Sequence, residues 1–310
     1  MIDIPDALIA TQSKYNGAAG RAFLAALPGM AAEFLERWGL RRDGEALYGV
    51  CALVLPVVRV ADGRPAALKL QAVDAETAGE PLALRVWGAA SAGAASACAV
   101  ELLDHDAATG TMLLERLDGR RSLSGAADAR EAVRIIAELL AGLTAVRAPA
   151  GSGLRGLVEA AARMLAAAPG AVGLLADEEE RRLLADCAAA VREVAGEPGD
   201  RLLHWDLHFG NVLAGRGGPA GQGARWVAID PKPLAGDPGF ELFPALVNRF
   251  DAEAVGWRFD LMTEVLGLDR GRARAWTLGR VLQNACWGAE DGARRLVPEQ
   301  AEIARRLLGR

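Results

Sequence analysis

The sequence predicts an α+β protein with two lobes: a small N-terminal lobe built on an antiparallel sheet and a larger, mainly helical C-terminal lobe. Short runs of β-branched and aliphatic residues, separated by turn residues, lie before residue 118. Beyond that point the apolar side chains recur at helical spacing over several long stretches. A chain of 310 residues with 52% hydrophobic content can bury one large core or two joined lobes. We therefore place the N-terminal lobe at 1–117 and the C-terminal lobe at 118–310.

The N-terminal lobe should contain a helical leader followed by two pairs of strands. The leader carries apolar side chains on a helical period, and Pro28-Gly29 is a point where it could break. Asp62-Gly63 has the chemistry of a hairpin turn, so the runs on either side should pair as antiparallel strands. The expected elements are a helix over 18–38 and strands over 46–60, 66–70, 100–105 and 111–117.

The C-terminal lobe should be mostly helical with one hairpin. Asp128 is a candidate helix cap because Glu131 follows three residues later, and Asp177 opens another helix with three acidic residues in its first turn. A Gly-rich loop over 215–223 should join the two strands of the hairpin. The expected elements are helices after Asp128, over 154–168, after Asp177 and across most of 237–310, with strands over 212–214 and 225–229.

Composition argues for a cytoplasmic protein that does not bind nucleic acid. The formal net charge is −5, which disfavours a nucleic-acid binder that must neutralise phosphates. The 4 cysteines are scattered without a C-x-x-C pair, as expected for reduced, buried thiols. No run reaches the ~18 continuous apolar residues of a membrane span, and Met1–Asp6 lacks a basic-then-apolar signal. We expect a monomer without nucleic-acid or membrane partners.

The most informative stretch runs from Arg201 to Pro231. It holds His204, Asp206 and Asn211 in the spacing H-x-D-x-x-x-x-N, with Asp230 following a Gly-rich gap. Asp206 would orient a hydroxyl nucleophile and accept its proton, and Asn211 and Asp230 offer the hard oxygen ligands that Mg²⁺ takes together with substrate phosphates. Pro231 favours an extended backbone at Asp230. This pattern predicts phosphoryl transfer.

The same spacing is the catalytic-loop signature of protein kinases, with Trp205 where those enzymes carry Arg. Together with Ile229-Asp-Pro231 and Gly236-Asp-Pro-Gly-Phe240, it resembles the aminoglycoside phosphotransferase family, and more narrowly its streptomycin 6-phosphotransferase and hydroxyurea phosphotransferase branch. Further matching stretches lie at 67–71, 82–87, 114–119 and 282–287. The resemblance implies a bilobal protein-kinase-like fold, ATP and Mg²⁺ as cofactors, and an aminoglycoside as acceptor. Streptomycin is the first expectation, and hydroxyurea or another small hydroxylated amine is the alternative.

The resemblance also assigns nucleotide-binding residues. Lys69 would contact the α- and β-phosphates and be held by a carboxylate on the next helix, either Glu80, which we favour, or Glu76 one turn earlier. Gly49 is the candidate phosphate-covering turn, and the alternative for a glycine beside a strand is a β-bulge. Glu115 and Leu117 match the hinge, whose backbone amide and carbonyl groups would read the adenine edge. The His204 ring would hydrogen-bond backbone near Asp230 and hold the loop.

The acceptor residues are the least constrained by the sequence. Streptomycin carries guanidinium groups, which favour carboxylates in the site. Candidates are Asp237 and Glu241 after the Ile-Asp-Pro turn, and Glu290 and Asp291 after Trp287. Each could instead be a helix cap or a surface ion-pair partner.

Two other functions remain open from the residues alone. The spacing His204-x-Asp206-x-His208 could belong to a metallohydrolase, although binuclear sites generally need more imidazoles than the 3 in this chain. A kinase fold that merely binds nucleotide is the other alternative, and it would require loss of the base, the metal ligands or the lysine, all of which are present.

Overall fold

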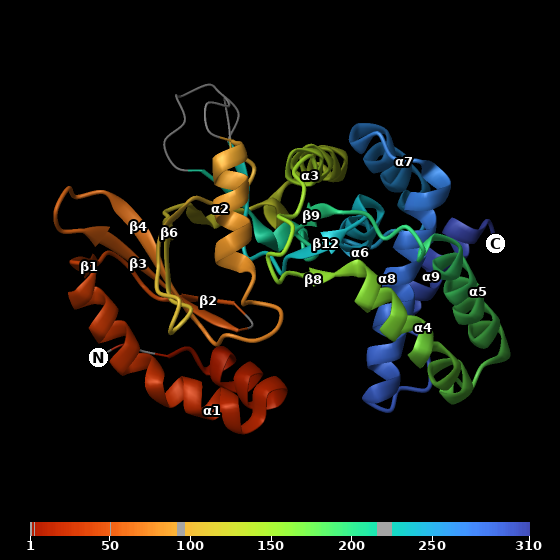
Figure 1. The fold of residues 1–310 in the computed structure, drawn as a ribbon, viewed down its shortest axis with the longest axis horizontal. Coiled ribbons are helices and arrows are strands. Elements are labelled where there is room, and N and C mark those ends of the chain that lie inside the picture. Colours follow the sequence, from red (N-terminus) through yellow and green to blue (C-terminus); the bar gives the residue numbers. More distant parts are fainter. Residues whose placement is uncertain (1, 3, 50, 92–96, 216–224) are drawn as a thin grey trace. The chain divides into compact units, whose positions relative to one another are not determined.

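The computed structural model describes residues 2, 4–49, 51–91, 97–215 and 225–310 (Figure 1). The chain divides into two compact units: Met1–Arg121 with Leu213–Val227, and Ser122–Val212 with Ala228–Arg310. The division thus falls after Arg121 rather than after residue 117. A three-stranded sheet in the order β11-β10-β7 joins the segment that follows residue 117 to the segment Leu213–Val227, so most of both segments groups with the first unit. Its strands are β7 (Asp118–Ser122), β10 (Val212–Ala214) and β11 (Trp226–Ala228).

The main sheet of the first unit has six antiparallel strands in the order β1-β3-β4-β6-β5, with β2 paired to β3. The predicted strands are confirmed, except that 46–60 forms two strands because the N–H of Gly49 donates to the Ala52 carbonyl and closes a turn. Gly63 has φ 69° in the turn between β3 and β4. The strands are β1 (Leu40–Arg42), β2 (Leu47–Tyr48), β3 (Ala52–Arg59), β4 (Pro65–Gln71), β5 (Leu102–His105) and β6 (Met112–Glu115).

Helix α1 (Asp6–Arg37) packs against β1 and β4. It begins earlier than expected, and the predicted break at Pro28-Gly29 is wrong because Pro28 lies inside the helix. The helical geometry is interrupted at Gly17 instead, whose φ of 50° and ψ of −122° are accessible to glycine. Leu27 and Phe34 are fully buried in one core with Leu68 of the sheet.

Helix α2 (Glu80–Ala90) follows β4 and contacts β5. It begins at Glu80, so Glu76 lies in the preceding turn and not on the helix as expected. The side chain of Asp74 accepts the backbone N–H groups of Glu76 and Thr77, which stabilises that turn. Of the two candidate carboxylates, only Glu80 therefore lies on the helix.

The second unit is mainly helical, as predicted. The Asp128 and Asp177 side chains cap α3 and α5 by accepting the N–H groups of Arg130 and Glu180. Helix α8 packs against α4, α5, α9 and η3. The helices are α3 (Ala129–Thr144), α4 (Leu157–Leu174), α5 (Glu178–Val194), α6 (Phe243–Val247), α7 (Ala254–Leu266), α8 (Arg270–Glu290) and α9 (Pro298–Leu308), with short 3-10 turns η1 (Leu123–Gly125), η2 (Phe209–Asn211) and η3 (Pro238–Glu241).

A second small sheet, in the order β8-β12-β9, positions the central stretch of the sequence. Strand β12 pairs antiparallel with β9, with Leu234 opposite Leu203, immediately before His204. The N–H of Lys232 donates to the carbonyl of His204, which continues the contact beyond the strands. The strands are β8 (Arg155–Gly156), β9 (Arg201–Leu203) and β12 (Leu234–Gly236).

Helix α4 is long and apolar enough to cross a membrane when judged by length and composition alone. Core helices of soluble proteins pass the same test. This helix packs against α5 and α8, and its Pro169 lies inside the helix rather than ending it near residue 168 as expected.

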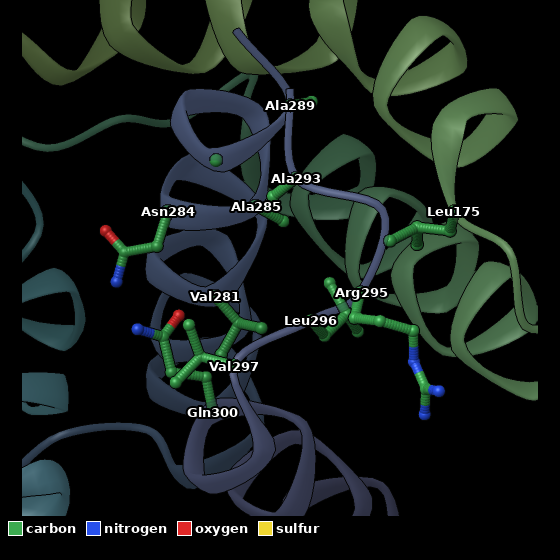
Figure 2. A pocket seen from close by; sticks show the side chains of 11 residues that line it. Leu175, Val281, Asn284, Ala285, Ala289, Ala293, Arg295, Leu296, Val297 and Gln300 are labelled. Carbon is green, nitrogen blue, oxygen red and sulfur yellow. The ribbon is translucent and has the colours of Figure 1, made fainter. Parts of the chain in front are cut away.

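A small cavity of about 50 Å³ lies beside α8, next to the segment that leads to α9. Val281 and Ala285 from α8 face Leu296 across it, and the Arg295 side chain extends away from them (Figure 2). The Arg295 guanidinium instead donates to Glu180 of α5. A space of this size suits only a few water molecules, so we assign it no ligand.

Candidate functional site

His204 anchors the loop that joins β9 to η2. Its side chain is fully buried, and Nε2 lies 3.0 Å from the carbonyl oxygen of Ile229. Its Nδ1 accepts the N–H of Asp206 at 3.4 Å, so Nε2 carries the proton and donates to Ile229. Burial lowers the pKa of His204 to about 3, which keeps the ring neutral. The ring holds backbone next to Asp230.

Trp205 has φ 68°, a left-handed conformation that bulky residues rarely adopt. Its N–H donates to Oε1 of Glu241 at 2.8 Å, and this bond fixes the peptide between His204 and Trp205. Strained backbone of this kind persists where surrounding contacts over-determine it, and it concentrates at functional sites. The strain here directly precedes the candidate base, Asp206.

Asn211 closes the loop onto Asp206. Its Nδ2 donates to the Asp206 carbonyl at 2.9 Å and lies 3.5 Å from the Asp206 carboxylate atom Oδ2. Because these contacts use the amide nitrogen, Oδ1 remains as an acceptor. The Asn211 carbonyl accepts the N–H of Ile229 at 2.9 Å, which brings Asp230 beside it. The structure thus brings Asp206, Asn211 and Asp230 together.

The backbone at Asp230 differs from expectation. Its φ is 58° rather than extended, so the bias from Pro231 is overridden. Aspartate tolerates the left-handed region better than most residues. The Lys232 ammonium lies 2.9 Å from Oδ1 of Asp230, and the lysine side chain is 14% exposed. Sequence reasoning missed Lys232, although a lysine two residues after a candidate metal ligand was a usable signal.

The electrostatics of the loop favour a basic Asp206. Burial raises the pKa of the Asp206 carboxyl above its ordinary value, and the negative charge of Asp230 acts in the same direction. The positive charges of Lys232 and Arg280 oppose the shift. A carboxylate with a raised pKa accepts a proton more readily, as a general base requires.

The oxygen groups of this loop fit Mg²⁺. Asn211 Oδ1 and the Asp230 carboxylate are hard acceptors, and Lys232 shows that a cation is already accommodated beside Asp230. The histidines do not fit a metallohydrolase. The ring nitrogens of His204 are occupied by backbone groups, and Nδ1 of His208 accepts the N–H of Gly210. No cluster of three or more His, Cys, Asp or Glu side chains suited to a metal occurs in the described residues.

In the first unit, Lys69 forms a buried ion pair with Glu80. Its Nζ lies 2.7 Å from both carboxylate oxygens, and the two side chains are 5% and 0% exposed. Gln71 Nε2 donates to the same carboxylate at 2.9 Å. Lys69 sits in β4 between fully buried Leu68 and Leu70. The pairing selects Glu80 over Glu76.

The other predicted nucleotide residues also lie in the first unit. Gly49 lies in the turn between β2 and β3, and a Cβ there would meet nothing within 4 Å among the described atoms. Glu115 ends β6, but its N–H donates to the carbonyl of Glu101, so that amide cannot read adenine as expected. The Glu115 side chain pairs with Arg225. Leu117 is buried between β6 and β7.

Two of the four acceptor candidates are corrected by the structure. Asp237 is buried, accepts the N–H of Gly239 and pairs with Arg272 at 2.5 Å, so it caps η3 rather than facing an acceptor. Glu241 is fully buried against the loop. Burial raises its pKa to about 7. Sequence pattern cannot distinguish such carboxylates from exposed ones.

Glu290 and Asp291 remain exposed at the end of α8. Glu290 is the last residue of the helix, and the Asp291 N–H caps it by donating to Trp287. They are the two acceptor candidates that a ligand could reach.

A cluster of aromatic and guanidinium groups surrounds Trp205, and the sequence did not reveal it. The guanidinium carbons of Arg155 and Arg280 lie 4.5 Å and 5.0 Å from the Trp205 ring centre. Trp287 of α8 meets the same ring edge to face, with centroids 6.1 Å apart. An arginine within the apolar stripe of α8, beside Trp276 and Leu278, was the available signal for Arg280.

Comparison with known sequences gives consistent matches over the chain. A sequence model of the family described as "Aminoglycoside/hydroxyurea antibiotic resistance kinase" matches residues 37–292. A hydroxyurea phosphotransferase from Kitasatospora aureofaciens is 62% identical over all of this chain and 87% of its own length. A streptomycin 6-kinase from Streptomyces glaucescens is 49% identical over all of this chain and 98% of its own.

Solved structures resemble the fold. The GDP complex of aminoglycoside 2'-phosphotransferase-IIIa aligns with a TM-score of 0.58 at 12% identity, covering 91% of this chain and 98% of the other. An ethanolamine kinase from Plasmodium vivax aligns with a TM-score of 0.54 at 11% identity, covering 87% and 82%. At such low identity these likenesses speak for the fold alone, and they confirm the protein-kinase-like class.

Proposed function

The chain belongs to the aminoglycoside/hydroxyurea antibiotic resistance kinase family and is a phosphotransferase, and we propose that it moves the terminal phosphoryl group of ATP to a hydroxyl of hydroxyurea. The 62% identity to a hydroxyurea phosphotransferase supports that acceptor. Streptomycin is the second candidate, supported by the 49% identity to a streptomycin 6-kinase. We further propose that the protein is cytoplasmic and monomeric. Sedimentation of the purified protein would test whether it is a monomer.

The observation that carries the proposal is the loop geometry around Asp206. Its carboxylate lies beside Asn211 and Asp230 and has a raised pKa. In the proposed reaction Asp206 orients the acceptor hydroxyl and takes its proton as the oxygen attacks the terminal phosphorus of ATP, whose bond to the bridging oxygen breaks so that ADP leaves. Most of the rate would come from positioning and charge stabilisation, as is usual for phosphoryl transfer.

Asn211 and Asp230 would hold Mg²⁺. When bound, the ion neutralises negative charge on the transferring phosphates. Asn211 is pre-oriented, because its amide nitrogen is tied to the Asp206 carbonyl at 2.9 Å. Lys232 holds the Asp230 carboxylate in position by pairing with it at 2.9 Å.

The first unit would bind the nucleotide. The Lys69 ammonium is held by both oxygens of Glu80, so it can meet the α- and β-phosphates without losing its conformation. The turn at Gly49 has room beside its backbone for phosphate oxygens. At the hinge, the carbonyl of Glu115 and the backbone of Leu117 would read adenine, since the Glu115 amide is already bonded.

The test of the base is Asp206→Asn, which preserves the shape of the side chain. We expect kcat to fall roughly 10²- to 10⁴-fold with nucleotide affinity retained, the usual worth of general base catalysis. Glu193→Gln on the exposed surface of α5 is the control for loss of a carboxylate. Near-normal turnover by Asp206→Asn would refute the assigned role.

The acceptor is identified by product analysis. The wild-type protein is incubated with Mg²⁺ and ATP, or with GTP in a parallel reaction, and with hydroxyurea or streptomycin. Phosphorus NMR of the product locates the phosphorylated atom. Turnover of streptomycin alone would exchange the order of the two candidates, and turnover of neither would refute both.

A further inference from the structure

We propose that the indole of Trp287 is the platform on which the acceptor's planar urea or guanidine group stacks, with Glu290 accepting its N–H. This inference rests on the proposed function for the identity of the acceptor class. It gives Trp287 its first role and assigns Glu290, one of the two exposed acceptor candidates, a specific contact; both residues lie in the second unit.

The first argument is the exposure of Trp287. Its side chain is 43% exposed, whereas most tryptophans of the second unit are more deeply covered. Among the described residues of that unit, the other exposed large hydrophobic side chains are aliphatic: Val158, Leu174 and Val297. A half-exposed indole leaves aromatic surface available, and tryptophan is enriched at interfaces because it combines a large apolar face with an N–H.

The second argument is the position of this indole beside the catalytic loop. Its ring centroid lies 6.1 Å from that of Trp205, at an interplanar angle of 73°. Trp205 directly precedes Asp206 in the chain. A ligand on Trp287 would therefore lie within a few side-chain lengths of the base.

The third argument is that Trp205 has no room for such a ligand. It is 5% exposed, and the guanidinium groups of Arg155 and Arg280 already lie over its ring. The protein itself thus uses arginine-on-indole stacking at this loop. Trp287 offers the same chemistry on a surface that is still open.

The fourth argument is the charge next to Trp287. Glu290 is exposed and follows it by three residues on α8, so the two side chains are neighbours on the helix surface. Burial raises the pKa of the Cys286 thiol, and the charge of Glu290 acts in the same direction. An indole face with a carboxylate one turn away suits a planar N–H donor.

Urea and guanidinium share this planar N–H chemistry but differ in charge. Both can stack on an indole and donate hydrogen bonds to a carboxylate. A guanidinium gains cation–π attraction and an ion pair in addition, so its binding should weaken more with salt than that of a neutral urea.

The test compares Trp287→Leu and Trp287→Phe with wild type, using the acceptor that the wild-type protein phosphorylates. Trp287→Leu should raise the acceptor KM roughly 5- to 30-fold, with kcat and the KM for ATP nearly unchanged. Trp287→Phe should recover much of the loss. Leu174→Ala is the matched control, since that residue is equally exposed at 43% and lies on α4. Glu290→Gln should weaken streptomycin more than hydroxyurea.

A fall in kcat with unchanged acceptor KM would overturn the inference, because Trp287 would then act only by supporting Trp205. Trp287→Leu with wild-type KM would overturn it as well.

A second readout separates this inference from the proposed function. The indole N–H resonance of Trp287, assigned by its absence in Trp287→Phe, is followed during titration with methylguanidinium chloride at low millimolar concentration. A saturable shift, weakened in Glu290→Gln, supports the platform even if neither acceptor is phosphorylated. If the acceptor is phosphorylated but neither methylguanidinium nor the acceptor shifts the Trp287 indole resonance, the platform is refuted and the proposed function stands.

Discussion

Removing one partner of the buried Lys69–Glu80 pair should cost much more stability than removing both. The ammonium lies 2.7 Å from both oxygens of Glu80, and Gln71 donates to one of them at 2.9 Å. The two charged side chains are 5% and 0% exposed, so water cannot replace a lost partner.

The expected magnitude follows from this geometry. Two unit charges 2.7 Å apart attract by about 6 kcal/mol at an effective dielectric constant of ~20, and desolvation of each ion costs several kcal/mol. The intact pair is therefore close to neutral in net stability. Lys69→Met leaves the Glu80 carboxylate buried with only the Gln71 amide, which should cost about 3–5 kcal/mol. Lys69→Met/Glu80→Leu should lie within about 1 kcal/mol of wild type.

Urea unfolding of the wild type, the two single variants and the double variant, at a constant m-value, gives the free energies of unfolding from which the coupling between Lys69 and Glu80 is calculated. The control is the exposed pair Arg182–Glu178, 3.3 Å apart, whose coupling should be below about 1 kcal/mol. The double variant is also expected to lose ATP affinity while keeping its stability, which separates the phosphate-binding role from folding. If Lys69→Met costs less than about 1 kcal/mol, or if the two single effects simply add, the reasoning about the buried pair is refuted.

Further predictions concern the loop and its surroundings. Burial raises the pKa of Glu241 from an ordinary 4.5 to about 7, so the folded state binds a proton more tightly than the unfolded state does, and the free energy of unfolding should fall as pH rises through that range. The loss should be on the order of 3 kcal/mol, measured as the difference between urea titrations at pH 5 and pH 8. Glu241→Gln should remove this difference. Because the pKa of Asp206 is raised, kcat should decline on acidification at a pH above the usual range of aspartate, and a decline only within that range would contradict the shift. Asp230→Asn should raise the Mg²⁺ concentration for half-maximal rate by at least roughly tenfold, and an unchanged requirement would exclude it as a ligand. Gly199→Ala should lower the free energy of unfolding by at least ~2 kcal/mol more than Gly151→Ala: φ is 78° and 68° respectively, but only at Gly199 would a Cβ come within 2.9 Å of backbone atoms.

The sequence determined the two-part order of the chain and the chemistry of the loop. Hairpin turns, helix caps and apolar periods are local signals, and Asp62-Gly63, Asp128 and Asp177 acted as their residue types predict. Their spacing in the sequence sufficed to predict that Asp206 and Asn211 lie in one site, because residues 206–211 are six successive positions of one loop and their side chains cannot lie far apart.

Backbone conformations at the loop could not be predicted from local rules. Asp230 precedes a proline yet has φ 58°, and Trp205 is bulky yet has φ 68°. Both are held by groups distant in the sequence. The carbonyl of His204 accepts the N–H of Lys232, two residues after Asp230, and Glu241 accepts the N–H of Trp205. Local preferences of a few kcal/mol at most yield to such tertiary contacts.

Burial divided the acidic residues into classes that the sequence left equal. Asp237, Glu241 and Glu290 are all carboxylates near the predicted acceptor region, and no pattern distinguishes them. In the fold, Asp237 is a buried helix cap and Glu241 is a buried acceptor that supports the loop. Glu290 is exposed on the helix that carries Trp287. Residue type by itself determined what chemistry this protein can perform, whereas only the packing of distant segments decided which side chains meet water, since desolvation depends on every element that surrounds a group.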